Sequence, residues 1–392
     1  MNPSTNLSTI LPRYRAVAWM CAPTLALAIA CAGGSAPTPS PTPLPGPNPT
    51  TGSNAPPAVP SPLVSTTWPL RTREHVDLWL HAYALLTRDT TLVPYFRRGY
   101  AESINATRRQ RGVTSLLDTN RDRLLARLDV NPTIATSGQF LPLYFASWDQ
   151  MRQAIDIFIR AGGNANATND PTTRAYFAVL ASAYQTAPDR EWLRLFAEAV
   201  DDESRRFYHD YWTSQSRAHA GVLARTDSLW QRSWRPALQR FLNNTQQQNG
   251  ELYLSAPLGG EGRTVKFGKS ENAVAGPLPT TTGEADVVLY VMAHELAGTI
   301  ASSAIEDNTT PAERRTGTTS RYEQSAAVRA GALLLERALP AALPGYMRFY
   351  LQTTGRATPP TDARTLFAST FAVPQPIIDA MARQLDVILG GI

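Results

Sequence analysis

The chain has 392 residues, of which 43% are apolar and 18% are charged. This composition can supply one large or two ordinary hydrophobic cores, and it excludes a wholly disordered protein. Two cysteines exclude a disulfide scaffold and a cysteine-rich metal cluster, and a net charge of +5 over this length gives no argument for nucleic acid as a partner.

Residues 1–30 have the pattern of a signal peptide. A short basic stretch is followed by residues 16–30, which carry no charge and are too few for a membrane span of about 20 residues. The following Cys31, with small residues from Ala28 before it, resembles the lipobox of bacterial lipoproteins. That resemblance implies an acylated (palmitate-type) Cys31 and a protein held on a membrane of the bacterial envelope, periplasm-facing or in the outer membrane. The same small residues also fit ordinary cleavage, which would give a secreted protein.

A linker is predicted over residues 31–67. Residues 31–70 hold 12 of the 31 prolines, mixed with Ser, Thr and Gly, and they include no charged side chain. Such a composition cannot form a core and favours extended polyproline conformations. We therefore expect a tether between the membrane and a folded, exported domain over residues 68–392.

The first half of this domain is predicted to be helical, because apolar residues recur at helical spacing. The spacing predicts helices over residues 71–89, 94–109 and 113–128, a further helix that ends near residue 159, one that starts at Pro171, and a long helical run from 189 to 242.

Arginines are concentrated in the second and third of these helices. Between Tyr95 and Val130 the chain has eight arginines (97, 98, 108, 109, 111, 121, 123 and 127) and four acidic residues. The ordinary interpretation is a solvated helical face. Contact with anionic lipid headgroups is the alternative.

The pattern changes after residue 250. Strands are predicted over Glu251–Ser255, Thr264–Phe267 and Asn272–Gly276, with a glycine-rich turn at 259–262. The most apolar helix, 285–305, follows, and another helix is predicted over 321–339. The whole is an α+β pattern that is predominantly α-helical, a large helical body with a small, late sheet.

The helix over 285–305 carries the residues with the clearest chemical potential. Zinc peptidases use H-E-x-x-H on a helix, in which the first His binds the metal, the Glu acts as base on metal-bound water, and the second His lies one turn further on. His294 and Glu295 match the first two positions. Gly298 stands where the second His is needed, so the motif is degenerate.

Residues 250–340 resemble the zincin metallopeptidases, specifically the gluzincin type. In that group an edge strand and a loop precede the motif helix, and a second helix supplies a glutamate ligand, here Glu323. The resemblance implies zinc as the cofactor, with His294 and Glu323 as ligands and Glu295 as the catalytic base if the protein is active. A third protein ligand would have to come from elsewhere in the chain.

Two functions follow from these patterns. The first is a diverged metallopeptidase relative on the cell envelope, inactive or weakly active, with an unknown peptide or protein partner. The second is a non-catalytic helical binding or assembly protein in which His294 is structural and Glu323 belongs to a capping box that begins at Ser320. The spacing of the other histidines (75, 81, 209 and 219) does not place any of them beside His294.

Overall fold

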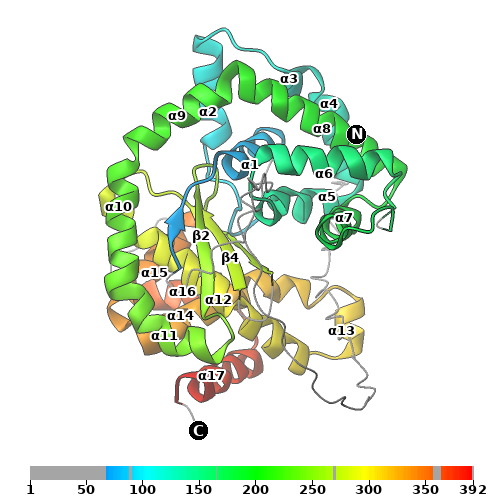
Figure 1. Cartoon of the computed structure of the whole chain (residues 1–392). Coiled ribbons are helices and arrows are strands. Elements are labelled where there is room, and N and C mark those ends of the chain that lie inside the picture. The colour runs from blue at the N-terminus through cyan, green and yellow to red at the C-terminus, as the bar shows by residue number, and fades with distance from the viewer. Residues whose placement is uncertain (1–67, 88–90, 165, 268–270, 356–362, 391–392) are drawn as a thin grey trace, which may run out of the picture. The chain divides into compact units, whose positions relative to one another are not determined.

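The computed structural model describes residues 68–87, 91–164, 166–267, 271–355 and 363–390. The described part is mainly helical and contains one four-stranded sheet (Figure 1), which confirms the predicted α+β class. The helices before the main strands are α1 (Glu74–Leu86), α2 (Tyr100–Gln110), α3 (Leu116–Thr119), α4 (Arg121–Val130), α5 (Pro132–Thr136), α6 (Trp148–Arg160), α7 (Pro171–Ala183), α8 (Ala187–Glu203), α9 (His209–Ala218), α10 (Ala220–Leu229) and α11 (Arg235–Asn244). The helices after them are α12 (Asp286–Asp307), α13 (Pro311–Arg315), α14 (Ser320–Ala338), α15 (Leu343–Thr353), α16 (Ala363–Thr370) and α17 (Gln375–Gly390). The predicted signal peptide, Cys31 and the linker lie outside the described residues.

The sheet consists of β1 (Leu70–Arg71), β2 (Asn249–Ser255), β3 (Arg263–Lys266) and β4 (Glu271–Pro277), in the order β1-β2-β4-β3. The strands β1, β2 and β4 are parallel, and β3 runs antiparallel to β4 at the edge. The three late strands confirm the sequence prediction. The strand β1 was not predicted, because two residues give no alternating pattern.

Both faces of the sheet are buried. Tyr253 and Ala273 pack on one face against the helices of the N-terminal half, whereas Leu252 and Val274 pack on the other against α11, α12 and α14. Parallel strands are usually covered on both sides in this way. The sheet therefore separates two hydrophobic cores, and the helix α12 packs on the face of the second core, beside β4.

One predicted helix boundary was wrong. Helix was expected from Pro94, but the chain stays irregular until α2 begins at Tyr100. Phe96 forms an antiparallel bridge with Leu258, and the Arg97 amide donates to the Pro257 carbonyl at 2.8 Å. This pairing with the loop after β2 is a long-range contact that local periodicity cannot show.

The predicted helix over 113–128 is divided into α3 and α4. Ser115 caps α3, since its hydroxyl accepts a hydrogen bond from the Leu117 amide while Asp118 accepts one from the Ser115 amide. Such caps fix where a helix begins. The helical run from α8 to α11 follows one path in Figure 1, with a π-helical turn after α8, a single turn residue, His219, between α9 and α10, and another π-helical turn after α10.

A buried ionic network joins α1, α2 and α8. Glu203 accepts from His81 Nε2 at 3.2 Å, from Arg108 Nη2 at 3.0 Å and from the Ser115 hydroxyl at 2.5 Å. The second ring nitrogen of His81 contacts the Tyr100 hydroxyl at 3.0 Å. The network leaves the Glu203 charge paired, which a charge at this depth requires.

The helix α12 lies inside a longer helical segment, Thr282–Asp307, that is long and apolar enough to cross a membrane by length and composition. Within the protein, however, 72% of its apolar window is buried. The segment therefore has the burial of a core helix, and its buried residues belong to the second hydrophobic core.

Trp68 anchors the start of the described chain. Its side chain is fully buried, its Nε1 donates to the Gln247 carbonyl at 3.0 Å, and its own carbonyl accepts from Trp230 Nε1 at 2.8 Å. The Trp68 ring lies directly on Gly250, where an added Cβ would come within 2.5 Å of it. Only glycine leaves room for the ring at that point.

We expect Gly250→Ala to lower the free energy of unfolding by about 1–3 kcal/mol, because the new methyl group must displace the Trp68 ring. Urea denaturation followed by tryptophan fluorescence measures the loss. Gly221→Ala is the matched control, since no atom lies within 4 Å of a Cβ there. That helical position should gain up to about 1 kcal/mol. Equal stability of both variants would contradict the close packing of Trp68.

Candidate metal centre

The helix α12 positions His294 and Glu295 inside the protein. Its apolar side chains face the second core, and α14 packs closely along it. Close approach occurs at Gly331 of α14, where an added Cβ would lie 3.0 Å from the backbone nitrogen of His294. The two helices therefore meet backbone to backbone at this level, and the residue His294 is 2% exposed.

Glu261 reaches His294 from the loop between β2 and β3. Several distant segments hold this loop: the Glu261 amide donates to the Pro94 carbonyl at 3.1 Å, and Tyr350 donates to the Gly260 carbonyl at 3.2 Å. The next residue is Gly262, where a Cβ would lie 2.5 Å from the Ala275 carbonyl oxygen and 3.0 Å from Cγ of Glu295. Glycine at 262 thus allows the loop to pass beside α12.

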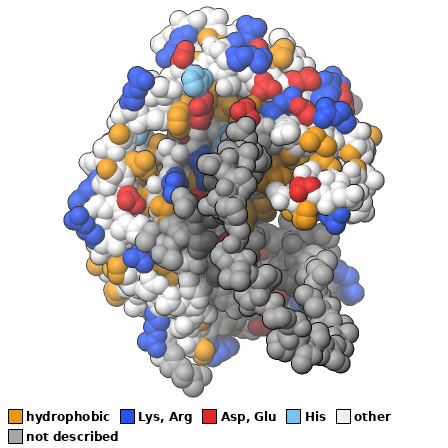
Figure 2. Space-filling view, in the orientation of Figure 1, with side chains coloured by type: hydrophobic (Ala, Val, Ile, Leu, Met, Phe, Trp, Pro, Cys, Tyr) orange, Lys and Arg blue, Asp and Glu red, His pale blue; other side chains and the backbone are white. Residues whose placement is uncertain are grey.

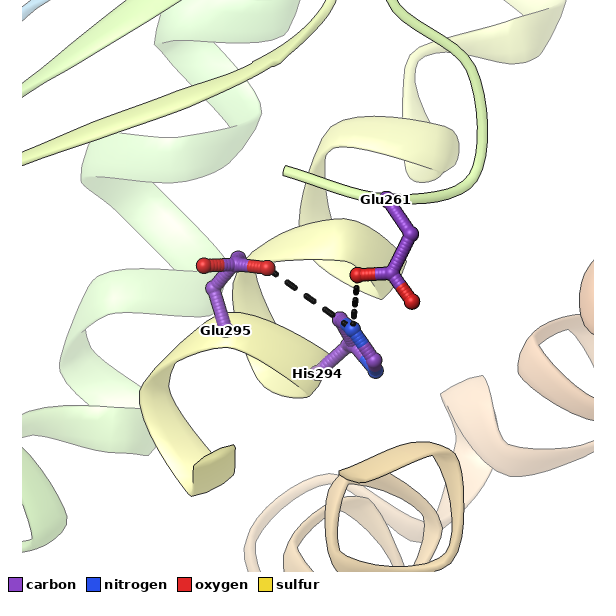
Figure 3. Close-up of side chains that lie close together, drawn as sticks. All are labelled: Glu261, His294 and Glu295. Carbon is purple, nitrogen blue, oxygen red and sulfur yellow. Dashed lines mark hydrogen bonds and ion pairs between the residues drawn. The ribbon is translucent and has the colours of Figure 1, made fainter. Parts of the chain in front are cut away.

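Three side chains converge at this point. His294 Nε2 lies 2.9 Å from Oε2 of Glu261 and 3.7 Å from Oε1 of Glu295, and both carboxylates approach the same ring nitrogen (Figure 3). One potential ligand atom from each residue lies within 4.8 Å of the other two. Glu295 is held from its other oxygen by the Thr264 hydroxyl at 3.1 Å. Glutamate and histidine atoms so arranged can hold a metal ion.

Two glutamates and one histidine lie close together in a buried position, and this arrangement shifts the pKa values of His294 and Glu295. Burial alone would lower the pKa of His294, but the carboxylates of Glu261 and Glu295 outweigh burial and raise it. Burial raises the pKa of Glu295, although the neighbouring His294 opposes that rise. The cluster therefore holds protons more tightly than the same residues do in water.

The rest of the His294 ring lies among aromatic residues. Its centroid is 5.5 Å from that of Tyr350 on α15, with the rings inclined at 36°. The other ring nitrogen, Nδ1, is buried and has no hydrogen-bond partner of normal geometry within the described chain. His294 thus directs one nitrogen to the carboxylates, and the Ala327 backbone of α14 also helps to raise its pKa.

The structure does not bring Glu323 to this cluster, so the ligand predicted from the resemblance is not among the converging residues. Glu323 is half-buried near the start of α14, and burial raises its pKa. Its neighbour Gln324 instead donates to Oε1 of Glu261 at 3.0 Å and to the Val93 carbonyl at 2.7 Å.

The predicted capping box at Ser320 was also wrong. The helix α14 begins at Ser320 itself, its N-cap residue is Thr319, and no side chain caps it. Glu323 is consequently the fourth helical residue and does not reach the cap. The reason is local: residues 316–319 form a turn that continues directly into the helix.

The remaining histidines contact other parts of the described chain. His75 contacts the Phe145 carbonyl, His81 contacts Glu203, His209 contacts Glu74 and His219 contacts the Gln215 carbonyl. None of them is a member of the cluster. Gly298 lies one turn after His294, and an added Cβ there would meet no atom within 4 Å.

Sequence reasoning identified His294 and Glu295 but missed Glu261, which it placed in a turn. The signal was available in the glycines on both sides, at 259, 260 and 262, which mark a backbone that passes close to other atoms. Comparison with models of protein families, with curated proteins and with solved structures finds no match. The geometry of the described residues is therefore the basis for a function.

Proposed function

We propose that this is an exported, lipid-anchored protein of the bacterial envelope whose domain binds one zinc ion in a diverged zincin-type site with little or no peptidase activity. The observation that carries the proposal is the convergence of Glu261, His294 and Glu295, whose ligand atoms lie within 4.8 Å of one another in a buried position.

The charge of the cluster favours a divalent cation. Two carboxylates and one imidazole in a buried site need two positive charges for neutrality, and buried charges that stay uncompensated are costly. Protons on His294 and Glu295, whose pKa values are both raised, supply them in the metal-free protein. Zinc would supply the same two charges and release protons as it binds.

The donor set and the spacing also fit zinc. Zinc accepts imidazole nitrogen and carboxylate oxygen at about 2.0–2.2 Å, so that ligand atoms around a tetrahedral ion lie about 3.4 Å apart. The 2.9 Å and 3.7 Å separations from His294 Nε2 to the two carboxylates lie on either side of this value. Small side-chain movements would bring all three ligand atoms onto one ion.

The arrangement of the elements supports descent from a zincin framework. The antiparallel edge strand β3, the strand β4, the helix with His294-Glu295 and the second helix α14 follow one another as that resemblance implies. The ligand positions differ, because Gly298 lacks a side chain and Glu261 comes from the loop before β3. We infer that Glu261 supplies a metal ligand in place of the one that the helix lacks at Gly298.

The same geometry disfavours efficient catalysis. The side chains of His294, Glu295 and Glu261 are 3%, 7% and 9% exposed, so a peptide bond has no direct access to an ion between them. A catalytic zinc site keeps a reachable open position for water and substrate. Glu295 would also be occupied as a ligand instead of serving as a free base.

Calorimetric titration of the metal-free protein with zinc tests the proposal. We expect one site, and a release of about one to two protons per ion, measured in buffers of different ionisation enthalpy. Glu295→Gln should weaken binding by at least about 100-fold. Glu323→Gln is the matched control and should leave binding unchanged, because Glu323 is not in the cluster.

Absence of zinc binding to the unmodified protein at pH 8 would overturn the metal site. The cluster would then be a hydrogen-bonded ion pair between His294 and Glu261, and a non-catalytic helical binding or assembly protein would be the better account. Equal loss of affinity in both glutamate variants would instead return Glu323 to the ligand set.

The lipid anchor has its own test. Cys31→Ser should leave the domain folded and abolish acylation, because the thioether requires the thiol. Several acyl chains anchor a protein stably, whereas a chain-free protein has no such attachment. Membrane fractionation with detergent partitioning measures the change, and a serine variant that stays in the membrane pellet would contradict the lipoprotein assignment.

A further inference from the structure

A cavity of about 420 Å³ lies between α2, α4 and the end of α1, far along the chain from the metal cluster. Its wall includes Arg108, Arg109 and Arg121, against a single acidic residue, Asp118. Four apolar residues, Leu85, Leu86, Val113 and Leu117, and the polar residues Asn105 and Thr114 complete the wall. The cavity is therefore basic with an apolar side, and its volume lies in the range of small-molecule sites.

One arginine of this cavity, Arg109, differs from the other arginines nearby, whereas Arg121 donates to the Leu85 carbonyl at 2.5 Å. On the outer surface, arginine side chains are interspersed with Asp and Glu over α3, α4 and α8 (Figure 2). Arg123, for example, pairs with Glu191 at 3.0 Å. Arg109, by contrast, has no hydrogen-bond or ion-pair partner for its side chain anywhere in the described ranges.

Arg108 adds a buried donor. It is 4% exposed, and its terminal nitrogens already bind Asp118 and Glu203, yet its Nε is buried without a partner within the described chain. Buried donors without partners are rare and costly, so such an atom beside a cavity indicates a missing acceptor. Because Glu203 and Asp118 hold the guanidinium group of Arg108 in place, the N–H bond at its Nε points in a fixed direction.

We propose that this cavity binds a phosphate ester, with Arg109 and Arg121 contacting the phosphate oxygens, Arg108 fixed beside them, and the apolar wall contacting the carbon skeleton. Arginine forks match phosphate geometry and bind several of its oxygens at once. The ester is either a soluble metabolite or the headgroup of an anionic lipid, which share this chemistry.

Thermal denaturation of the full-length protein at constant ionic strength tests the site, with inorganic phosphate and glycerol phosphate as probes and chloride as the reference. We expect saturable stabilisation by both probes, stronger for the ester. Arg109→Gln should weaken the response at least about tenfold without unfolding the protein, because that side chain has no hydrogen-bond or ion-pair partner among the described residues.

Arg123→Gln is the matched control, since it removes the same charge from α4 outside the cavity. Competition by vesicles of phosphatidylglycerol, but not of phosphatidylcholine, would assign the site to lipid headgroups, and no competition would assign it to soluble esters. The proposal is overturned if neither probe saturates, or if Arg109→Gln and Arg123→Gln weaken binding equally. Neither result depends on the metal cluster.

Discussion

Gly298→His should raise the affinity of the protein for zinc by about two orders of magnitude or more. The new imidazole lies about 6 Å along the helix axis from His294, one turn on, which is the separation at which two histidines share an ion. An added Cβ at 298 meets no atom within 4 Å, so a side chain can start there without a clash. His294, Glu295 and Glu261 would then supply the remaining ligands.

Calorimetric titration of both proteins measures the gain. Thr299→His is the matched control, because the next residue points about 100° round the helix and cannot share the ion. It should bind zinc as the unmodified protein does. Equal gains in the two variants would indicate adventitious surface binding, and no gain at 298 would mean that α12 does not retain zincin geometry.

The stability contributed by Asp77 should fall by about 3 kcal/mol as the pH rises from 4 to 8. Burial raises the pKa of Asp77 from 3.8 to about 6, although hydrogen bonds from Ser255 and Trp212 oppose the rise. A raised pKa means that the folded state holds the proton more tightly than the unfolded state. Its contribution is thus complete below pH 4 and is lost as the pH rises through 6.

His75, two residues earlier on α1, has the opposite effect in nearly the same pH range. Burial lowers the pKa of His75 from 6.5 to about 4, so its contribution is present above pH 6.5 and is lost on acidification. The two effects mask each other in the unmodified protein. The useful quantity is therefore the difference between the unmodified protein and Asp77→Asn, followed by urea denaturation across the pH range.

Asp77→Asn should be less stable at every pH, because an amide replaces the carboxylate that accepts from the Trp212 N–H. It should not, however, show the fall in stability that the ionisation of Asp77 causes as the pH rises. Ser255→Ala is a second test variant, since removing this hydrogen-bond donor should raise the pKa of Asp77 further. The fall in stability with rising pH should then be larger. Parallel pH curves for the unmodified protein and Asp77→Asn would mean that folding does not raise the pKa of Asp77.

Local patterns predicted most of the elements and two of the three residues of the cluster. The helix over 286–307 and the strands β2 to β4 follow from apolar periodicity, which depends only on neighbouring residues. His294 and Glu295 were found because both lie on one helix. Glu261 and Gln324 were missed because their contact arises from the folding of a loop onto α12 and α14, across 33 and 63 residues of sequence.

The wrong assignments have the same physical origin. Glu323 was chosen as a ligand because its distance along the chain suited a second helix, but the rotation of α14 about its axis turns Gln324 to the cluster. Sequence spacing gives the order of the helices and not the angle at which each one faces its neighbour. The start of α2 was predicted too early for a comparable reason, because the pairing of Phe96 with Leu258 is a long-range contact.

The Trp68 anchor also has a mechanical consequence. If Cys31 is held in a membrane, any tension in the tether enters the domain at Trp68, whose backbone lies in the left-handed region at φ +52°. The fully buried ring, its hydrogen bond to the Gln247 carbonyl and the hydrogen bonds that the Trp68 carbonyl accepts from Trp230 and Gln231 must yield before force reaches β1 or any helix. Trp68 would therefore resist this force, so that shear on the cell surface would act on the buried Trp68 side chain and not on the metal centre.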